Sequence, residues 1–375
     1  MRRILIGAVV LGACNSNKPA APVATAVPVT RTTSAAALAA LPELAVANGR
    51  LVCLAISGAP CPASNATANW LTDGKYATWE LRRPIEIWTP DKIDPEFLGA
   101  VGNSDSQYQA VLSVAATRSG FVVLTLPTSR ALLYDTKGRY TSSLPMPPVS
   151  VTRTRGFSGR IAFFQIIREA GRDSAAEFEV REVDGPGDTL GVSVLKTKLP
   201  WLILRDGRPT TPLTLLPTLP SYAFADDSDI VSSNGDRFSF ERRSPKGVLR
   251  WSLASDVAGP AVTPAELKLL RAKIPAANKA GFVSFDSAAA HTGKHFPAVV
   301  GLFVGSDGRV LAAAAPLPSR DSLDFYMLSN SGEPIGRFAL PNRTHPLLYA
   351  GDSLLVQRSG ANAALEMRWL VIKKP

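Results

Sequence analysis

The chain has 375 residues, of which 46% are hydrophobic and 19% are charged, so it is long and apolar enough to form a large core. Its formal charge is +10, from 41 basic and 31 acidic side chains, and the basic residues are scattered in ones and twos. Because no dense basic run with interleaved aromatic residues occurs, the composition argues against a nucleic-acid-binding protein. Such a mildly basic surface favours acidic envelope polymers as partners.

The first thirteen residues have the pattern of a short secretory signal peptide. Arginines at positions 2 and 3 are followed by an apolar stretch over residues 4–10. This stretch is too short to span a bilayer core, which needs about 20 residues, but it can be recognised and removed during export. The tetrad Leu11-Gly12-Ala13-Cys14 resembles a bacterial lipobox, which implies a diacylglycerol on the thiol of Cys14. An ordinary signal peptide with a chance cysteine is the alternative.

Residues 14–45 are expected to form a flexible tether. From Asn15 to about Ala40 the chain is rich in Ala, Pro, Thr and Ser, so it has too little apolar surface to offset its ordering entropy. Acyl chains contribute about 0.8 kcal/mol per buried methylene, so two or three of them hold a protein on a leaflet. We therefore expect a monomer anchored by lipid in the cell envelope, on the periplasmic side or at the outer membrane.

Cys53 and Cys61 remain once Cys14 is assigned to lipid. Gly58 and Pro60 bend the chain between them, and exported proteins meet an oxidising compartment. We therefore expect a disulfide within an N-terminal strand segment over residues 46–78, worth roughly 2–3 kcal/mol by chain entropy. Two free thiols are the alternative, whereas a metal pair would lack its third and fourth ligands.

Beyond Arg50 the pattern is of short β-runs separated by turn-forming residues, with almost no helical periodicity. Clear runs occupy residues 120–126, 160–167, 301–304 and 353–356. Asp307-Gly308 between apolar runs is a strong hairpin signal.

One helix is expected at residues 263–274, as an insertion between strands. Thr263 can cap it, Pro264 suits its first turn and Glu266 completes a capping box. Leucine at positions 267 and 270 and isoleucine at 274 form one apolar stripe.

A degenerate repeat is centred on Gly138, Gly247 and Gly332. Each glycine ends a polar turn that joins an alternating strand to a second strand, and glycine supplies the positive φ that such a turn requires. The separations of 109 and 85 residues each fit two or more propeller blades of about 40–50 residues.

These hairpins, with residues 297–310 and the closing strand 369–372, resemble six-bladed β-propellers related to NHL repeats, particularly exported bacterial ones. The resemblance covers about residues 75–375, apart from an irregular stretch between Met146 and Pro217. It implies an all-β propeller of six blades over residues 79–375. The tryptophans are then expected to pack between blades, with a sugar-binding face as the alternative: Trp70, Trp79, Trp88, Trp201, Trp251 and Trp369.

Motifs with catalytic or metal-binding potential are few. The carboxylates of Asp226, Asp227 and Asp229 are weak candidates for calcium, and a solvated turn explains them more simply. Gly351-Asp352-Ser353-Leu354 spells an esterase signature, but it lies between β-runs near the C-terminus, so Asp352 is expected to be a turn residue. The histidine pair in residues 291–295 has zinc-site spacing, but a glycine within it argues against the helix that such a site needs.

The sequence thus predicts a binding or scaffolding module whose partner is an envelope protein or a polymer such as a polysaccharide. No catalytic set and no required cofactor are apparent, so an enzyme is the less favoured hypothesis. The alternative is a calcium-dependent hydrolase of the lactonase type that uses the central channel of the propeller. The two hypotheses differ in whether acidic or amide side chains from several blades converge on one point.

Overall fold

The structure is a computed structural model of the whole chain. It describes the following residues: 28–54, 61, 66–71, 74–80, 82–90, 92, 94–117, 120–126, 130–145, 154–157, 160–168, 176–184, 196–199, 202–205, 208–212, 218, 221–225, 229–244, 247–273, 289, 292–359 and 365–373.

The described residues are mostly β-strand, with two helices, α1 (Ala35–Ala39) and α2 (Pro264–Lys273). Six larger sheets follow one another along the chain, and we number them 1 to 6. From the innermost strand outward, sheet 1 contains β3 (Thr67–Trp70), β4 (Tyr76–Trp79), β5 (Ile85–Trp88) and β6 (Glu96–Leu98). Sheet 2 contains β9 (Ala110–Thr117), β10 (Gly120–Leu126), β11 (Arg130–Asp135) and β12 (Tyr140–Pro145). Sheet 3 contains β13 (Thr154–Phe157), β14 (Arg160–Arg168), β15 (Ala176–Asp184) and β16 (Lys196–Leu199).

Sheets 4 to 6 continue this order. Sheet 4 contains β19 (Ser221–Phe224), β20 (Ile230–Ser233), β21 (Phe240–Arg243), β22 (Leu249–Ser255) and β1 (Val29–Thr33). Sheet 5 contains β23 (Gly301–Val304), β24 (Val310–Ala313), β25 (Ser322–Leu328) and β26 (Pro334–Pro341). Sheet 6 contains β27 (Thr344–Ala350), β28 (Ser353–Ser359), β29 (Leu365–Ile372) and β2 (Val46–Leu54). Two small sheets pair β7 (Ala100–Val101) with β8 (Gln107–Tyr108), and β17 (Leu202–Arg205) with β18 (Arg208–Pro212).

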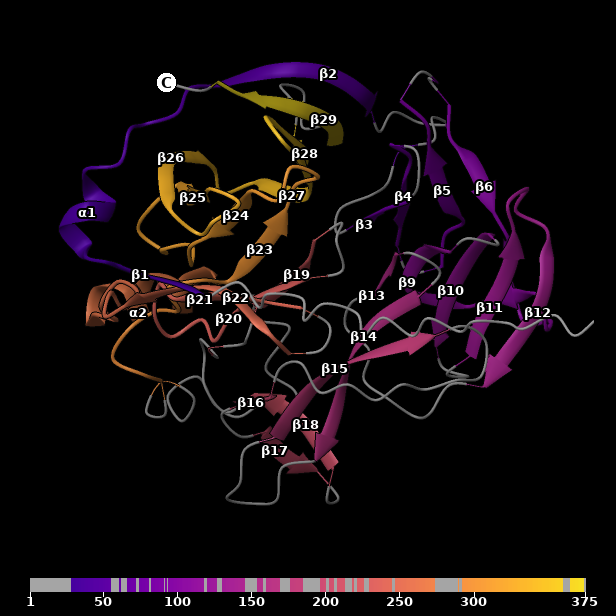
Figure 1. Ribbon diagram of the computed structural model, residues 1–375, viewed down its shortest axis with the longest axis horizontal. Helices are drawn as coiled ribbons and strands as arrows, with labels where there is room; N and C mark the ends of the chain where they lie inside the picture. The colour runs from indigo at the N-terminus through magenta and orange to yellow at the C-terminus, as the bar shows by residue number, and fades with distance from the viewer. Residues whose placement is uncertain are drawn as a thin grey trace, which may run out of the picture.

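The larger sheets are arranged around a common centre, as in a β-propeller (Figure 1). Their first strands lie toward the middle, where β27 contacts β3, β3 contacts β9, β9 contacts β13, β19 contacts β23 and β23 contacts β27. Strands β6 and β12 lie at the periphery in the same view. The expected all-β propeller architecture is therefore confirmed at the level of the fold.

The hydrophobic core lies between neighbouring sheets, because successive residues of each strand face opposite neighbours. In β24, for example, Val310 packs toward sheet 4 whereas Leu311 packs toward sheet 6. Further clusters join sheet 1 to sheet 2 and sheet 6 to sheet 1. The described tryptophan side chains belong to these clusters, as expected from packing between blades: Trp70, Trp79, Trp88, Trp251 and Trp369. Trp201 lies outside the described residues.

The three glycine-ended turns of the repeat are confirmed. Gly138, Gly247 and Gly332 have φ of +74°, +80° and +83°, and they join the hairpins β11–β12, β21–β22 and β25–β26. A Cβ at Gly332 would lie 2.5 Å from the Trp251 ring, so this turn packs directly against sheet 4. Gly308, with φ of +75°, likewise joins β23 to β24.

The inserted helix is confirmed as α2. Its capping is as expected, because the Glu266 amide donates to Thr263 Oγ1 at 3.2 Å. The Glu266 carboxylate accepts a hydrogen bond from the Ser319 amide at 3.0 Å, which ties the helix to the loop before β25. No side chain of α2 is fully buried, so the expected apolar stripe is only partly covered. No described helix is long and apolar enough to cross a membrane.

The expected boundaries at residues 45 and 79 need correction. Residues 1–27 lie outside the described residues, but β1 pairs in parallel with β22, so the tether cannot extend over all of 14–45. Leu38 and Leu44 are both 5% exposed and anchor this segment in two core clusters. Sheet 1 begins at Thr67, which pairs with Trp79, so the boundary at residue 79 would divide it. The alanine- and threonine-rich composition of this segment gives no sign that it pairs with the free edges of two sheets, so the expected tether was too long.

Strand β2 joins the N-terminal part of the chain to its C-terminal end. It pairs antiparallel with β29, with Val46 opposite Ile372, and so becomes the outermost strand of sheet 6. In Figure 1 it runs across the top of the molecule beside β29. Sheet 6 thus contains strands from the N-terminal and the C-terminal parts of the chain, and β2 covers the edge that β29 would otherwise expose.

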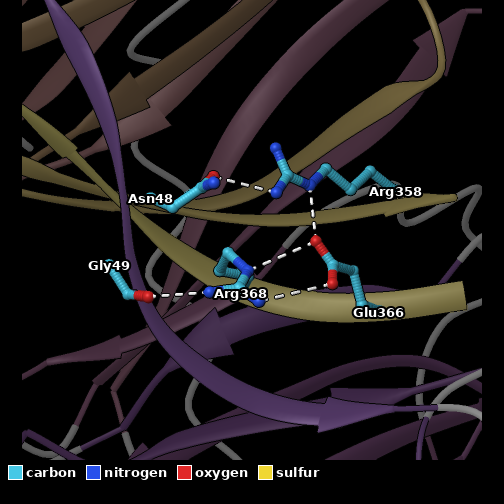
Figure 2. A network of polar contacts seen from close by, with 5 residues as sticks. All are labelled: Asn48, Gly49, Arg358, Glu366 and Arg368. Carbon is cyan, nitrogen blue, oxygen red and sulfur yellow. Dashed lines mark hydrogen bonds and ion pairs between the residues drawn. The ribbon is translucent and has the colours of Figure 1, made fainter. Parts of the chain in front are cut away.

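A polar network fixes β2 in this position (Figure 2). The Glu366 carboxylate accepts hydrogen bonds from Arg358 Nε at 2.6 Å and from Arg368 Nε at 3.2 Å. Each arginine then donates to β2, Arg358 to Asn48 Oδ1 and Arg368 to the Gly49 carbonyl, both at 2.9 Å. We call Glu366, Arg358 and Arg368 the closure network.

Candidate functional site

The first strands of the sheets line a central pocket of about 620 Å³. Its wall comes from β3, β9, β19, β23 and β27, which lie on five different sheets. A volume of this size lies within the usual range of about 300–1,000 Å³ for small-molecule sites. Because the inner strands of several sheets meet here, residues from different sheets can contact one ligand at the same time.

The wall of the central pocket is uncharged at the described positions. Of the described residues that line it, none is Asp, Glu, Lys or Arg. Aromatic and aliphatic side chains dominate, including Trp70, Tyr222, Phe224 and Phe303. The pocket can therefore bury apolar or stacking groups, but its described wall offers no carboxylate for a cation.

A few polar groups interrupt this apolar wall. Asn69 Nδ2 donates to the Val114 carbonyl at 2.8 Å, which links β3 to β9 across the gap between sheets. Trp70 Nε1 donates to the Tyr349 carbonyl at 3.2 Å and links β3 to β27 in the same way. These bonds hold neighbouring inner strands together and set the shape of the wall.

His345 is the one imidazole among the described lining residues. It lies on β27, and it is exposed by surface area although many protein atoms lie close to its ring. Burial lowers its pKa below the ordinary value, and a hydrogen bond to the Ala66 backbone opposes this only in part. The imidazole is therefore neutral near pH 7 and can both donate and accept hydrogen bonds.

The sequence reasoning missed His345 as a site residue. The segment Thr344-His345-Pro346 carries no motif, and its only signal is a polar residue at the start of a β-run. The partner of His345 across the strand pair is Gln357, which is 3% exposed.

Asp229 is the one acidic candidate among the described residues, and it does not line the central pocket. Asp226 and Asp227 lie outside the described residues. Asp229 is 4% exposed, and its carboxylate pairs with Arg242 at 3.1 Å and with Arg250 at 3.4 Å. Within the described part of the chain, no group of three or more His, Cys, Asp or Glu side chains is placed to hold a metal ion.

The other motif residues have structural surroundings. Asp352 lies in the turn before β28 and pairs with Arg309 at 2.7 Å, as expected for a turn residue rather than for part of an esterase site. His295 Nδ1 lies 3.0 Å from the Gly259 carbonyl, whereas His291 lies outside the described residues. Cys53 and Cys61 are joined by a disulfide, and Cys14 lies outside the described residues.

No protein-family model and no curated protein matches this chain. Among solved structures, an exported protein of Bacteroides fragilis is similar, with a TM-score of 0.53 and 10% identity over 93% of this chain and 100% of that chain. A DUF4221 family member from Bacteroides vulgatus has a TM-score of 0.51 and 10% identity over 89% and 100% of the two chains. At such low identity the likeness shows a shared fold and nothing about activity.

Proposed function

We propose that this chain is a lipid-anchored β-propeller outside the cytoplasm, which binds an envelope protein or polymer through its central pocket. The lipobox-like tetrad ending in Cys14 supports the anchor. The exported protein of Bacteroides fragilis with a similar fold supports the location. The observation that carries the binding role is the uncharged, largely aromatic wall of the central pocket.

The ring has six blades in this proposal, one for each of sheets 1 to 6. The blades run in chain order, and β2 supplies the outermost strand of the last blade. An N-terminal strand that completes the C-terminal blade is an economical way to close such a ring, because it pairs both chain ends at once. The same strand follows the anchored end of the chain, so the ring would be held close to the membrane.

The pocket favours a neutral part of the partner. Burial of an isolated charge in an apolar pocket is costly, and the described wall has no opposite charge to compensate it. A neutral sugar segment or an apolar side chain can instead stack on Trp70 or Phe303 and exchange hydrogen bonds with His345. Binding of this kind requires no metal and no chemical step.

A calcium-dependent hydrolase is the second candidate function. It requires acidic or amide oxygens from several blades at about 2.3–2.6 Å from one calcium ion. The described wall of the pocket contributes Asn69 and Asn342 but no carboxylate. Calorimetry with added calcium decides between the two, since heat of binding and a raised melting temperature would favour the hydrolase.

The binding role can be tested by filling the pocket. Thr67 lines it and is exposed, so Thr67→Trp should occupy the space without disturbing a packed core. Thr32→Trp, at the exposed outer edge of sheet 4, is the matched control. Partners crosslinked to the tethered protein in membranes should be recovered with the wild type and the control but lost with Thr67→Trp. Equal recovery with all three proteins would refute binding in the pocket.

The anchor is tested separately. Mass spectrometry of the mature protein should find a lipid on Cys14 at the new N-terminus, and Cys14→Ser should leave the protein unprocessed. An unmodified Cys14 in full-length protein from the envelope would remove the anchor while leaving the fold unaffected.

A further inference from the structure

A second pocket lies at the seam where sheet 6 meets sheet 1. We call it the seam pocket; it measures about 630 Å³ and is separate from the apolar central wall, although Trp70 borders both. Its wall combines aromatic rings with a guanidinium, supplied by Arg50, Trp70, Tyr76 and Trp369. Of the described residues that line it, none carries a carboxylate.

The aromatic part of the wall is a rigid platform. The rings of Trp70 and Trp369 are stacked with centroids 5.9 Å apart, and Tyr76 meets each of them edge-on at 5.9 Å. Both tryptophans are half-buried, whereas Tyr76 is only 2% exposed. Aromatic groups of this kind offer an apolar face and a polar tip to a ring-shaped ligand.

The polar side chains beside this platform can all donate hydrogen bonds, including the hydroxyls of Ser306 and Ser353, which can also accept. The Tyr76 hydroxyl is buried and makes no well-formed hydrogen bond with a described residue, although the Trp369 and Arg50 side chains lie near enough to interact with it. Burial raises the pKa of Tyr76 to about 12, and the nearby Arg50 and Trp369 lower it only in part, so the hydroxyl stays protonated. An indole N–H and a guanidinium only donate, and a protonated phenol can donate too. A buried polar group without a well-formed hydrogen bond is costly, so an acceptor from outside the chain would satisfy the Tyr76 hydroxyl.

The chain places Arg50 here by means of a β-bulge. Along the pairing of β2 with β29, Asn48 lies opposite Leu370 but Leu51 lies opposite Arg368, so Gly49 and Arg50 together face Trp369. A Cβ at Gly49 would lie 2.7 Å from the Trp369 carbonyl, so glycine is required at this point. Bulges redirect side chains, and this one leads the Arg50 guanidinium to the Pro90 carbonyl and the pocket.

Arg50 has guanidinium N–H donors beyond the one that bonds to Pro90. Its Nη1 donates to the Pro90 carbonyl, and no ion pair with an acidic side chain is found for it among the described residues. A guanidinium has five N–H donors in a fork that matches a carboxylate. The seam pocket thus pairs a ring-stacking platform with a carboxylate-binding donor set.

We infer that the seam pocket binds a carboxylate-bearing sugar ring, as found in an acidic polysaccharide. The ring would stack on the outward face of Trp70 or of Trp369. Its carboxylate would accept hydrogen bonds from Arg50, and a ring oxygen or hydroxyl would meet the Tyr76 hydroxyl. The site shares Trp70 with the central pocket, but Arg50 and Tyr76 line the seam pocket alone, so variants at these two residues test it separately from the binding role proposed above.

The test is calorimetric titration of the folded chain with a hexuronate trisaccharide and with the matching neutral hexose trisaccharide. The acidic sugar should bind and quench tryptophan fluorescence, and the neutral sugar should bind at least about tenfold more weakly, because a hydrogen bond to a charged group is lost. Arg50→Gln should weaken binding of the acidic sugar by a similar factor. Arg139→Gln, on the exposed β11–β12 turn, carries the same charge change and should leave binding unaltered.

Tyr76→Phe separates binding from folding. It removes a buried hydroxyl that makes no well-formed hydrogen bond, so the variant should fold at least as stably as the wild type while binding the acidic sugar several-fold more weakly. Tyr349→Phe removes a second such hydroxyl away from the seam pocket, and should leave sugar binding unaltered. The inference is overturned if neither sugar binds, if both bind equally, or if Arg50→Gln and Tyr76→Phe bind like the wild type.

Discussion

Glu366→Gln should loosen the strand that closes the ring. Glu366 orients Arg358 and Arg368, and both arginines hold β2 through Asn48 and Gly49 (Figure 2). Its side chain is 10% exposed, whereas those of the two arginines are 26% and 21% exposed. A glutamine keeps the shape but removes the charge, so it leaves two arginines without their counter-ion.

The expected loss lies between two limits. Exposed ion pairs contribute about 0–1 kcal/mol, whereas breaking a buried pair costs about 3–5 kcal/mol. With a nearly buried acid and partly exposed bases, we expect the free energy of unfolding to fall by about 2 kcal/mol, as for one lost hydrogen bond to a charged group. In a chain of this size that loss corresponds to a melting temperature lower by roughly 2–3 °C.

The pH dependence of this loss identifies its cause. Burial acts to raise the pKa of Glu366, but hydrogen bonds and charge from Arg358 and Arg368 outweigh it and hold the pKa below its usual value. A carboxyl with a lowered folded pKa stabilises fully above its unfolded pKa of about 4.3, and this stability disappears as the pH falls through the folded value. The gap between wild type and Glu366→Gln should therefore be complete at neutral pH and should narrow in acid.

Thermal unfolding followed by circular dichroism from pH 7 to pH 3 measures both effects. Glu333→Gln is the matched control, because Glu333 is an exposed acid in the β25–β26 turn. The control should unfold like the wild type at every pH. Identical melting temperatures for wild type and Glu366→Gln at pH 7, or a difference that persists unchanged in acid, would refute the role of the closure network.

Three further outcomes are expected. Replacing Cys53 and Cys61 together by alanine should lower the free energy of unfolding by about 2–3 kcal/mol in non-reducing denaturant titrations, and equal stability would contradict this. Gly332→Ala should destabilise more than Gly247→Ala, because both have positive φ but only the former turn packs against a tryptophan ring; equal losses in melting temperature would contradict that packing. The pKa of His345, measured by NMR with His345→Gln for assignment, should lie below about 6.5 because protein atoms desolvate the imidazole. The folded state should therefore lose stability progressively as the pH falls below that value. A pKa at or above about 6.5 would contradict desolvation as the cause.

Local turn chemistry made the fold predictable from the sequence. A glycine with positive φ after a polar turn is a local requirement, so Gly138, Gly247 and Gly332 marked three hairpins correctly. The capped helix after Thr263 was equally local, since its signals lie within four residues. The disulfide between Cys53 and Cys61 followed from their short separation and the bend between them.

What the sequence could not indicate depends on contacts between distant segments. Strand β1 pairs with β22 more than 200 residues away, and nothing in its threonine-rich sequence indicates which sheet edge is free. His345 lacks a motif, and it becomes a site residue only because the first strands of five sheets converge. The sequence around Arg50 does not distinguish it from other surface arginines, because only the register shift of β2 places it opposite Trp369.

The register of β2 connects the closure of the ring with the seam pocket. The Gly49 carbonyl that Arg368 holds belongs to the bulge that also carries Arg50. A weakened closure network should therefore release the bulge and, with it, the guanidinium of the pocket. Tyr76 belongs to sheet 1 and takes no part in that network, so its hydroxyl can be removed without loosening β2. If ring closure assembles the pocket, Glu366→Gln should lose both stability and sugar binding, whereas Tyr76→Phe should lose sugar binding at unchanged stability. If sheet 1 forms the pocket alone, Glu366→Gln should lose stability but keep sugar binding.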